Sequence, residues 1–126
     1  MRGDRTPVRV LVTGSRDWPR PQTVYMALWG LHRDTGGALL VVHGACPTGA
    51  DSAASEWCRA TRCGTEEKRP ADWEKWGKSA GPIRNQRMVN DGADVCLAFI
   101  KDNSRGATGC AGMAFAAGID TRIWRM

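Results

Sequence analysis

The stretch LLVVHGACPTGAD runs from Leu39 to Asp51 and leads into an alanine-rich helical segment. Its first four residues have the unbroken apolarity of a buried strand, and the glycines and threonine that follow are typical of a turn into a helix. The first backbone N–H groups of such a helix lack partners, and the helix dipole adds partial positive charge. Glycine lets the backbone approach a phosphate closely. The stretch therefore predicts a phosphate-binding turn, although neither GxGxxG nor GxxxxGK[ST] is present.

The same order of strand, turn and helix recurs along the chain. We expect strands at residues 8–13, 39–43, 65–69, 94–100 and 119–124, and helices after residue 21, after residue 50, and at residues 80–90 and 106–118. This alternation predicts a parallel sheet with helices on both faces. The two most apolar strands should lie side by side at the centre, with the charged third strand at an edge. The prediction is an α/β, Rossmann-like, three-layer domain with a five-stranded, mainly parallel sheet of order 3-2-1-4-5.

Length and composition limit the classes of protein to which the chain can belong. A chain of 126 residues suits a single domain, and we expect a cytoplasmic protein without a membrane partner, because the sequence shows neither a long apolar span nor the apolar segment of a signal peptide. Five cysteines without a CxxC pair predict neither disulfides nor zinc, and no metal or other cofactor is expected. The net charge of +5 favours anionic partners but does not separate a small phosphate-bearing molecule from nucleic acid.

The expected site lies beyond the carboxyl ends of the strands, where sheets of this kind bind ligands. The segments that follow residues 13, 43, 69 and 100 should converge there. The expected ligand-binding residues are Gly14, Ser15, Arg16, Gly44, Thr48, Gly49, Asp51, Arg84, Asn85, Arg105 and Thr108.

Individual residues have competing interpretations. Asp51 is expected to accept hydrogen bonds from a ribose or to orient a water, but Thr48 and Asp51 also have the spacing of a variant capping box. Arg84 is expected to bind phosphate in a bidentate manner from the first turn of its helix. Arg16 contacts phosphate in one interpretation and pairs with Asp17 in the other. If the protein is an enzyme, Asp51 and Arg84 are the expected catalytic residues.

Four further side chains leave alternatives open. Thr108 either donates to an anion or bonds within its own helix. Cys46 precedes a helix N-terminus, where a thiolate nucleophile would be stabilised, but His43 is expected to be structural rather than its base. Trp73 and Trp76 either stack on a base or pack the segment of residues 70–82 onto the body of the protein.

Taken together, the motifs resemble those of one family. GSRDW (14–18), GACPTGAD (44–51), PADWEKWGKSAGPIRNQRM (70–88) and a basic turn before a glycine- and alanine-rich helix occur in the order used by the SLOG superfamily. The chain looks like its YspA-like, YpsA-related branch over residues 8–124. The resemblance implies a Rossmann-like domain that binds nucleotides or nucleotide-derived molecules. Its relatives act as phosphoribohydrolases, signal sensors or single-strand DNA binders such as DNA-processing protein A.

The resemblance to the Lonely-guy phosphoribohydrolases is incomplete. Those enzymes carry an RKxxM-type helix start, which Arg84 and Met88 match, and a PGGxGTxxE loop, whose threonine Thr108 matches. Ala107 stands in place of the glycine that directly precedes this threonine, and Ala111 in place of the loop's glutamate. Cleavage of a ribosyl bond calls for a nearby carboxylate. The resemblance therefore implies hydrolysis only if Asp51 or another carboxylate, such as Asp17, replaces the glutamate.

Three functions follow as hypotheses. The leading one is binding of a phosphate-bearing nucleotide or nucleotide-derived ligand, as a sensor or sequestering protein. The first alternative is hydrolysis of the N-glycosidic bond of a nucleoside 5′-monophosphate. The second is single-stranded nucleic-acid binding through arginines near the chain ends, Arg2, Arg5, Arg9, Arg122 and Arg125. The resemblance also implies a homo-oligomer, with residues 106–118 or the tryptophan-bearing surfaces as the contact.

Overall fold

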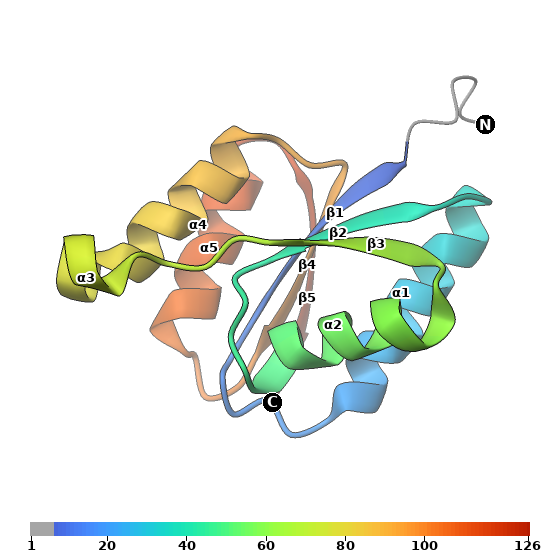
Figure 1. The fold of residues 1–126 in the computed structure, drawn as a ribbon, viewed down its shortest axis with the longest axis horizontal. Coiled ribbons are helices and arrows are strands. Elements are labelled where there is room, and N and C mark those ends of the chain that lie inside the picture. The colour runs from blue at the N-terminus through green and yellow to red at the C-terminus, as the bar shows by residue number, and fades with distance from the viewer. Residues whose placement is uncertain (1–6) are drawn as a thin grey trace.

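Five parallel strands form the middle layer of the protein in a computed structural model, which describes residues 7–126 (Figure 1). The strands are β1 (Val8–Gly14), β2 (Leu39–His43), β3 (Gly64–Lys68), β4 (Val95–Ile100) and β5 (Asp120–Arg125). Their order in the sheet is β3-β2-β1-β4-β5, which confirms the predicted order. The charged strand β3 lies at an edge, as expected.

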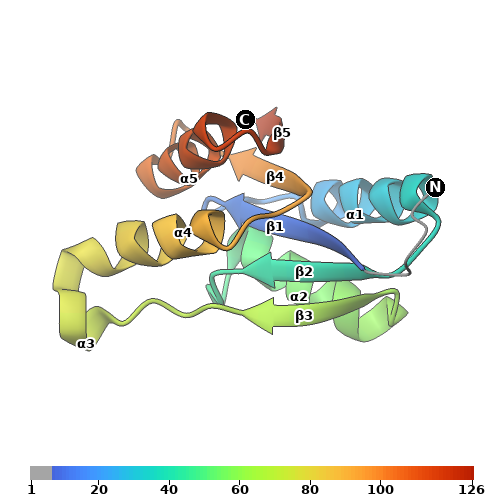
Figure 2. The same cartoon turned by 90° about the horizontal axis from the view of Figure 1, so that it is seen from above.

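Helices cover both faces of the sheet, and a short arm extends beyond it (Figure 2). Helices α1 (Pro21–Thr35) and α2 (Gly49–Thr61) lie on one face, and α4 (Ala80–Asn90) and α5 (Arg105–Ala116) on the other. The arm contains α3 (Trp73–Trp76) and the 3-10 helix η1 (Gly77–Ser79). The bounds of β2 and α4 coincide with the prediction, and the other strands differ from it by one residue at one or both ends. Within residues 7–126, no helix is both long and apolar enough to serve as a membrane span.

Successive side chains of a strand point to opposite faces of the sheet, and this alternation divides the core into clusters on the two faces. Val8, Val10 and Val12 of β1 pack into the cluster beneath α1 and α2, whereas Leu11 packs into the cluster beneath α4 and α5. Every residue of β4 is buried, because helices cover both of its faces. The neighbouring strands β1 and β4 therefore lie in the interior, β4 throughout and β1 except at Arg9 and Gly14.

The cysteines are free thiols, and three of them serve as small core residues. Burial raises the pKa of Cys58 to about 11 and the pKa of Cys96 to about 12. Burial also raises the pKa of Cys110. These three thiols therefore remain protonated and unreactive at neutral pH.

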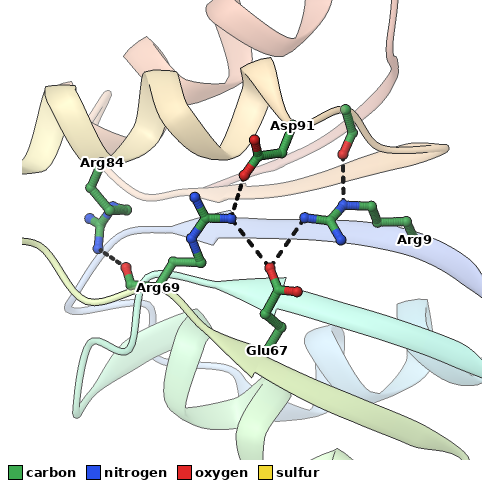
Figure 3. Close-up of polar contacts among 6 residues, drawn as sticks. Arg9, Glu67, Arg69, Arg84 and Asp91 are labelled. Carbon is green, nitrogen blue, oxygen red and sulfur yellow. Dashed lines mark hydrogen bonds and ion pairs between the residues drawn. The ribbon is translucent and has the colours of Figure 1, made fainter.

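A network of ion pairs joins the edge strand β3 to β1 and to the end of α4 (Figure 3). The carboxylate of Glu67 lies 3.2 Å from a guanidinium nitrogen of Arg9 and 3.3 Å from one of Arg69. The same nitrogen of Arg69 lies 2.6 Å from Asp91. The Asp91 hydrogen bond is the largest cause that raises the pKa of Arg69. The network connects Arg69, which directly precedes the arm, to the end of α4.

Two glycines allow the β1–α1 loop to contact the start of α2. Gly49, the first residue of α2, has a φ of 69°, and a Cβ there would collide with the main-chain oxygens of Ser15 and Arg16. A Cβ at Gly14 would collide with the side chain of Ala50. Contact between these backbones therefore sets how closely the β1–α1 loop approaches the start of α2.

We expect Gly49→Ala to destabilise the protein more than Gly36→Ala. Both glycines have a φ of 69°, but a Cβ at Gly36 would meet nothing within 4 Å. Gly36→Ala should therefore cost only the left-handed strain of about 1 kcal/mol, whereas Gly49→Ala should cost about 3 kcal/mol because the loops must also move apart. Urea unfolding measures both. Equal losses would contradict the contact.

Candidate functional site

A cavity of about 920 Å³ opens at the carboxyl ends of β1 and β2. Five segments converge on it, as the topology predicts for a parallel sheet of this order. They are the β1–α1 loop, the β2–α2 loop with the start of α2, residues 70–78 of the arm, the start of α4 and the turn into α5. The cavity is therefore built from parts of the chain that lie far apart in sequence.

Most of the predicted binding residues line this cavity. Those that do are Gly14, Arg16, Gly44, Thr48, Asp51, Arg84, Asn85 and Arg105. Three of the predicted residues, Ser15, Gly49 and Thr108, lie outside its lining. Lys78, which the sequence analysis did not single out, contributes a further cation from the arm. No local pattern marks Lys78, because its place in the wall depends on how the arm folds back over the start of α4.

The three residues outside the lining have structural surroundings instead. The Ser15 hydroxyl is buried and accepts a hydrogen bond from the main-chain N–H of Lys101 at 2.8 Å, so it joins the ends of β1 and β4. Gly49 packs against the β1–α1 loop. Thr108 is exposed within α5, and its N–H bonds to the carbonyl of Ser104.

Arg84 is largely committed to hydrogen bonds with neighbouring segments, of which Figure 3 draws the one to the carbonyl of Arg69. Its Nη1 donates to the carbonyl of Gly44 at 2.7 Å and to that of Arg69 at 3.2 Å, and its Nε donates to Oδ1 of Asn85 at 2.6 Å. A side chain on Gly44 would collide with this guanidinium. Only Nη2 has no hydrogen-bond partner within residues 7–126. The expected bidentate binding of phosphate by Arg84 is therefore not prearranged. Arg84 would first have to break one of its present hydrogen bonds to a carbonyl oxygen.

Asp51 is a buried carboxyl group at the cavity wall, with 7% of its surface exposed. Its Oδ2 accepts a hydrogen bond from the N–H of Cys46 at 3.2 Å. Burial raises the pKa of Asp51, and it outweighs the opposing effects of His43, the Cys46 amide and Arg84. The capping-box alternative is wrong: Thr48 is the N-cap residue of α2, but its side chain makes no capping bond, and the Asp51 carboxylate accepts from Cys46 instead.

His43 supports the loop above it rather than entering the cavity. The N–H of Ala45 donates to its Nδ1 at 3.0 Å, so the proton must lie on Nε2, which donates to Glu66 at 3.0 Å. Although burial opposes it, hydrogen bonds from Ser55 and His43 lower the pKa of Glu66. The loop needs this support because Ala45 has a φ of 61°, which is uncommon for a residue other than glycine.

Cys46 lines the cavity, but His43 does not activate it. Both ring nitrogens of His43 are already used, and the Cys46 thiol lies 3.7 Å from the hydroxyl of Thr48. The other histidine, His32, bonds to the carbonyl of Gly37 through Nδ1. The geometry therefore offers no imidazole base for nucleophilic catalysis by this thiol.

Arg16 and Asp17 do not pair with each other as one interpretation expected. Asp17 lies 3.2 Å from Nζ of Lys101, and hydrogen bonds to Asp17 and Asp102 raise the pKa of Lys101. The guanidinium carbon of Arg16 lies 5.6 Å from the centre of the Trp73 ring. Arg16 therefore faces the arm across the cavity.

Two helix N-termini at the cavity have no side-chain cap. The N-cap residues Thr48 of α2 and Ser104 of α5 both line the cavity, and neither side chain accepts a bond from its helix. Their first N–H groups are therefore available to another acceptor. Four cationic side chains and two carboxylates share the same walls: Arg16, Lys78, Arg84 and Arg105, with Asp17 and Asp51.

We expect Asp51→Asn to stabilise the protein at neutral pH. Burial raises the pKa of Asp51 in the folded protein above the unfolded value of about 3.9. The folded state therefore favours the protonated acid. The stability that this acid contributes is present below the unfolded pKa and is lost as pH rises through the folded pKa. The variant avoids this loss. Its melting temperature at pH 7 should exceed that of the unmodified protein by about 3 °C, for about 1 kcal/mol, and the difference should shrink below pH 4. Asp17→Asn is the control, because it removes an exposed ion pair and should give no gain. A gain that did not depend on pH would contradict this account.

Comparison with known proteins identifies the family. Residues 8–76 match the family described as YAcAr: YspA, cpYpsA-related SLOG family. The Gene 61 protein of Mycobacterium phage D29 is 48% identical over 116 residues, which cover 88% of this chain and 91% of that protein. No solved structure matches the chain. The family match spans β1 to α3 and so includes the first two loops of the cavity. The chain belongs to the YspA, cpYpsA-related SLOG family.

Proposed function

We propose that the protein binds a phosphate-bearing nucleotide or nucleotide-derived molecule in this cavity and acts as a sensor or sequestering protein. The observation that carries the proposal is the convergence of two uncapped helix N-termini on a cavity with four cationic side chains. Free N–H groups and helix dipoles favour an anion at this place. Membership of the SLOG family is consistent with a nucleotide-related ligand.

The proposed ligand lies with its phosphate toward the starts of α2 and α5. Arg105 belongs to the first turn of α5 and lines the cavity, so it can add a charge-assisted hydrogen bond. Nη2 of Arg84 supplies a second donor without disturbing the bonds that Nη1 and Nε make. Asp51 is then placed to accept hydrogen bonds from ribose hydroxyl groups, which are donors as well as acceptors.

Hydrolysis of an N-glycosidic bond is the second candidate function. The observation that favours it is Asp51, since a buried carboxyl group with a raised pKa at a cavity is typical of a general acid or base. Ala111 does not supply the carboxylate of the hydrolytic relatives, and it is buried on the core-facing side of α5. Incubation with nucleoside 5′-monophosphates followed by detection of free base tests this function. If Asp51→Asn abolishes turnover and leaves binding intact, the protein is an enzyme.

Single-stranded nucleic-acid binding is the remaining alternative. Of the arginines on which it depends, Arg9 pairs with Glu67, Arg122 with Asp120, and Arg125 bonds to Asn103. Arg2 and Arg5 lie outside the described residues. Binding along a phosphate backbone would weaken steeply with ionic strength, so a salt titration against oligonucleotides distinguishes it from binding of one nucleotide.

Self-association stays a prediction, with α5 as the proposed contact. The glycines at 106, 109 and 112 leave open space where a side chain would lie, and Phe115 is 75% exposed. Light scattering during size-exclusion chromatography tests it, and a monomer at micromolar concentration would count against it.

We expect Arg105→Ala to weaken nucleotide binding about tenfold, because it removes one charge-assisted hydrogen bond of about 1.5 kcal/mol. Arg59→Ala is the matched control, since Arg59 is also an exposed helical arginine but lies in the last turn of α2. Isothermal titration calorimetry with nucleoside 5′-monophosphates measures both. Equal losses in the two variants would indicate a general charge effect. Mass spectrometry of small molecules that co-purify with the protein identifies the natural ligand.

A further inference from the structure

Trp73 presents an open aromatic surface to the cavity. Its side chain is 49% exposed, whereas Trp18 and Trp57 are 6% and 2% exposed and belong to the core. Trp76, in the same helix, is 38% exposed but faces a separate hollow of about 110 Å³. Of these tryptophans, Trp73 is the one that lines the large cavity.

The arm holds the Trp73 ring in place without covering it. The N–H of Lys75 donates to the carboxylate of Asp72 at 3.1 Å, which caps the short helix that carries the ring. A Cβ at Gly81 would lie 3.5 Å from the ring edge, so the start of α4 lies close to the indole. The turn that carries the ring is therefore held by its own cap and lies beside the start of α4.

Arg16 is a weakly held neighbour of this ring. Its guanidinium lies 5.6 Å from the ring centre, and the adjacent carboxylate of Asp17 is taken by Lys101. A cation over an exposed aromatic ring contributes only about 0.5–1 kcal/mol. An anionic or aromatic ligand can therefore displace Arg16 at little cost.

We infer that Trp73 is the surface on which the aromatic base of the ligand stacks, once Arg16 has left the ring. The inference rests on the proposed function and adds the part of the site that distinguishes a nucleotide from a sugar phosphate. Stacked planes lie about 3.5 Å apart, so a base between ring and guanidinium needs about 7 Å, more than the 5.6 Å present. Arg16 must therefore move outward. Every base has a flat π-face, so the stack selects for a base but not for one particular base.

The experiment compares adenosine 5′-monophosphate with ribose 5-phosphate by isothermal titration calorimetry. The unmodified protein should bind the nucleotide at least about tenfold more tightly than the sugar phosphate, because base stacking on an aromatic side chain contributes about that much. Trp73→Ala should weaken nucleotide binding about tenfold and leave ribose 5-phosphate binding unchanged. Trp73→Phe should retain part of the preference. Trp76→Ala is the matched control and should retain all of it.

The outcomes separate the inference from the proposed function. If Trp73→Ala and Trp76→Ala bind the nucleotide equally well, or if the unmodified protein binds both compounds equally, the stacking inference is wrong and nucleotide binding stands. If the unmodified protein binds neither compound, both fall. Thermal unfolding of each variant shows whether it is folded, and Trp73→Phe keeps the comparison decisive should Trp73→Ala prove unstable.

Discussion

The close contact between the β1–α1 loop and the first residue of α2 is the constraint on which the site depends. The backbone at Gly49 touches the main-chain oxygens of Ser15 and Arg16, and no larger residue fits there. Ser15 in turn binds the main chain of Lys101 at the end of β4. These contacts thus link the ends of β1 and β4 to the start of α2, and the cavity opens beside them. Close packing of these backbones is one source of its shape.

Several side chains expected to bind a ligand are instead used to build the cavity. A guanidinium group that leaves water must find acceptors, and Arg84 finds them in two main-chain carbonyls and Asn85. Its bonds to Gly44 and Arg69 connect α4 to the ends of β2 and β3. In the proposed complex, the phosphate would therefore depend more on the helix N-termini and on Arg105 than the sequence motif suggests.

Asp51 differs from Arg84, because the burial of its carboxyl group lowers the stability of the protein. A carboxyl group with a raised pKa in the folded protein weakens the fold at neutral pH. Such a cost is typical of groups that serve binding or catalysis. The neighbouring His43 and Glu66 are, in contrast, satisfied by each other and by the loop. Asp51 is thus the buried group of this site for which we propose a role toward a ligand.

The sequence alone determined the sheet order, the edge position of β3, the bounds of α4 and the edge of the sheet at which the loops meet. These features follow from local patterns of apolar residues and from the handedness of parallel crossovers, both of which can be read along the chain. The tertiary structure alone decided the partners of individual side chains. Arg84 bonds to a carbonyl 40 residues away, and Ser15 to an N–H 86 residues away. The pairing of Asp17 with Lys101 and the approach of Arg16 to Trp73 likewise cross between loops. Such contacts depend on where packing places each loop in space, and no spacing in the sequence records that position.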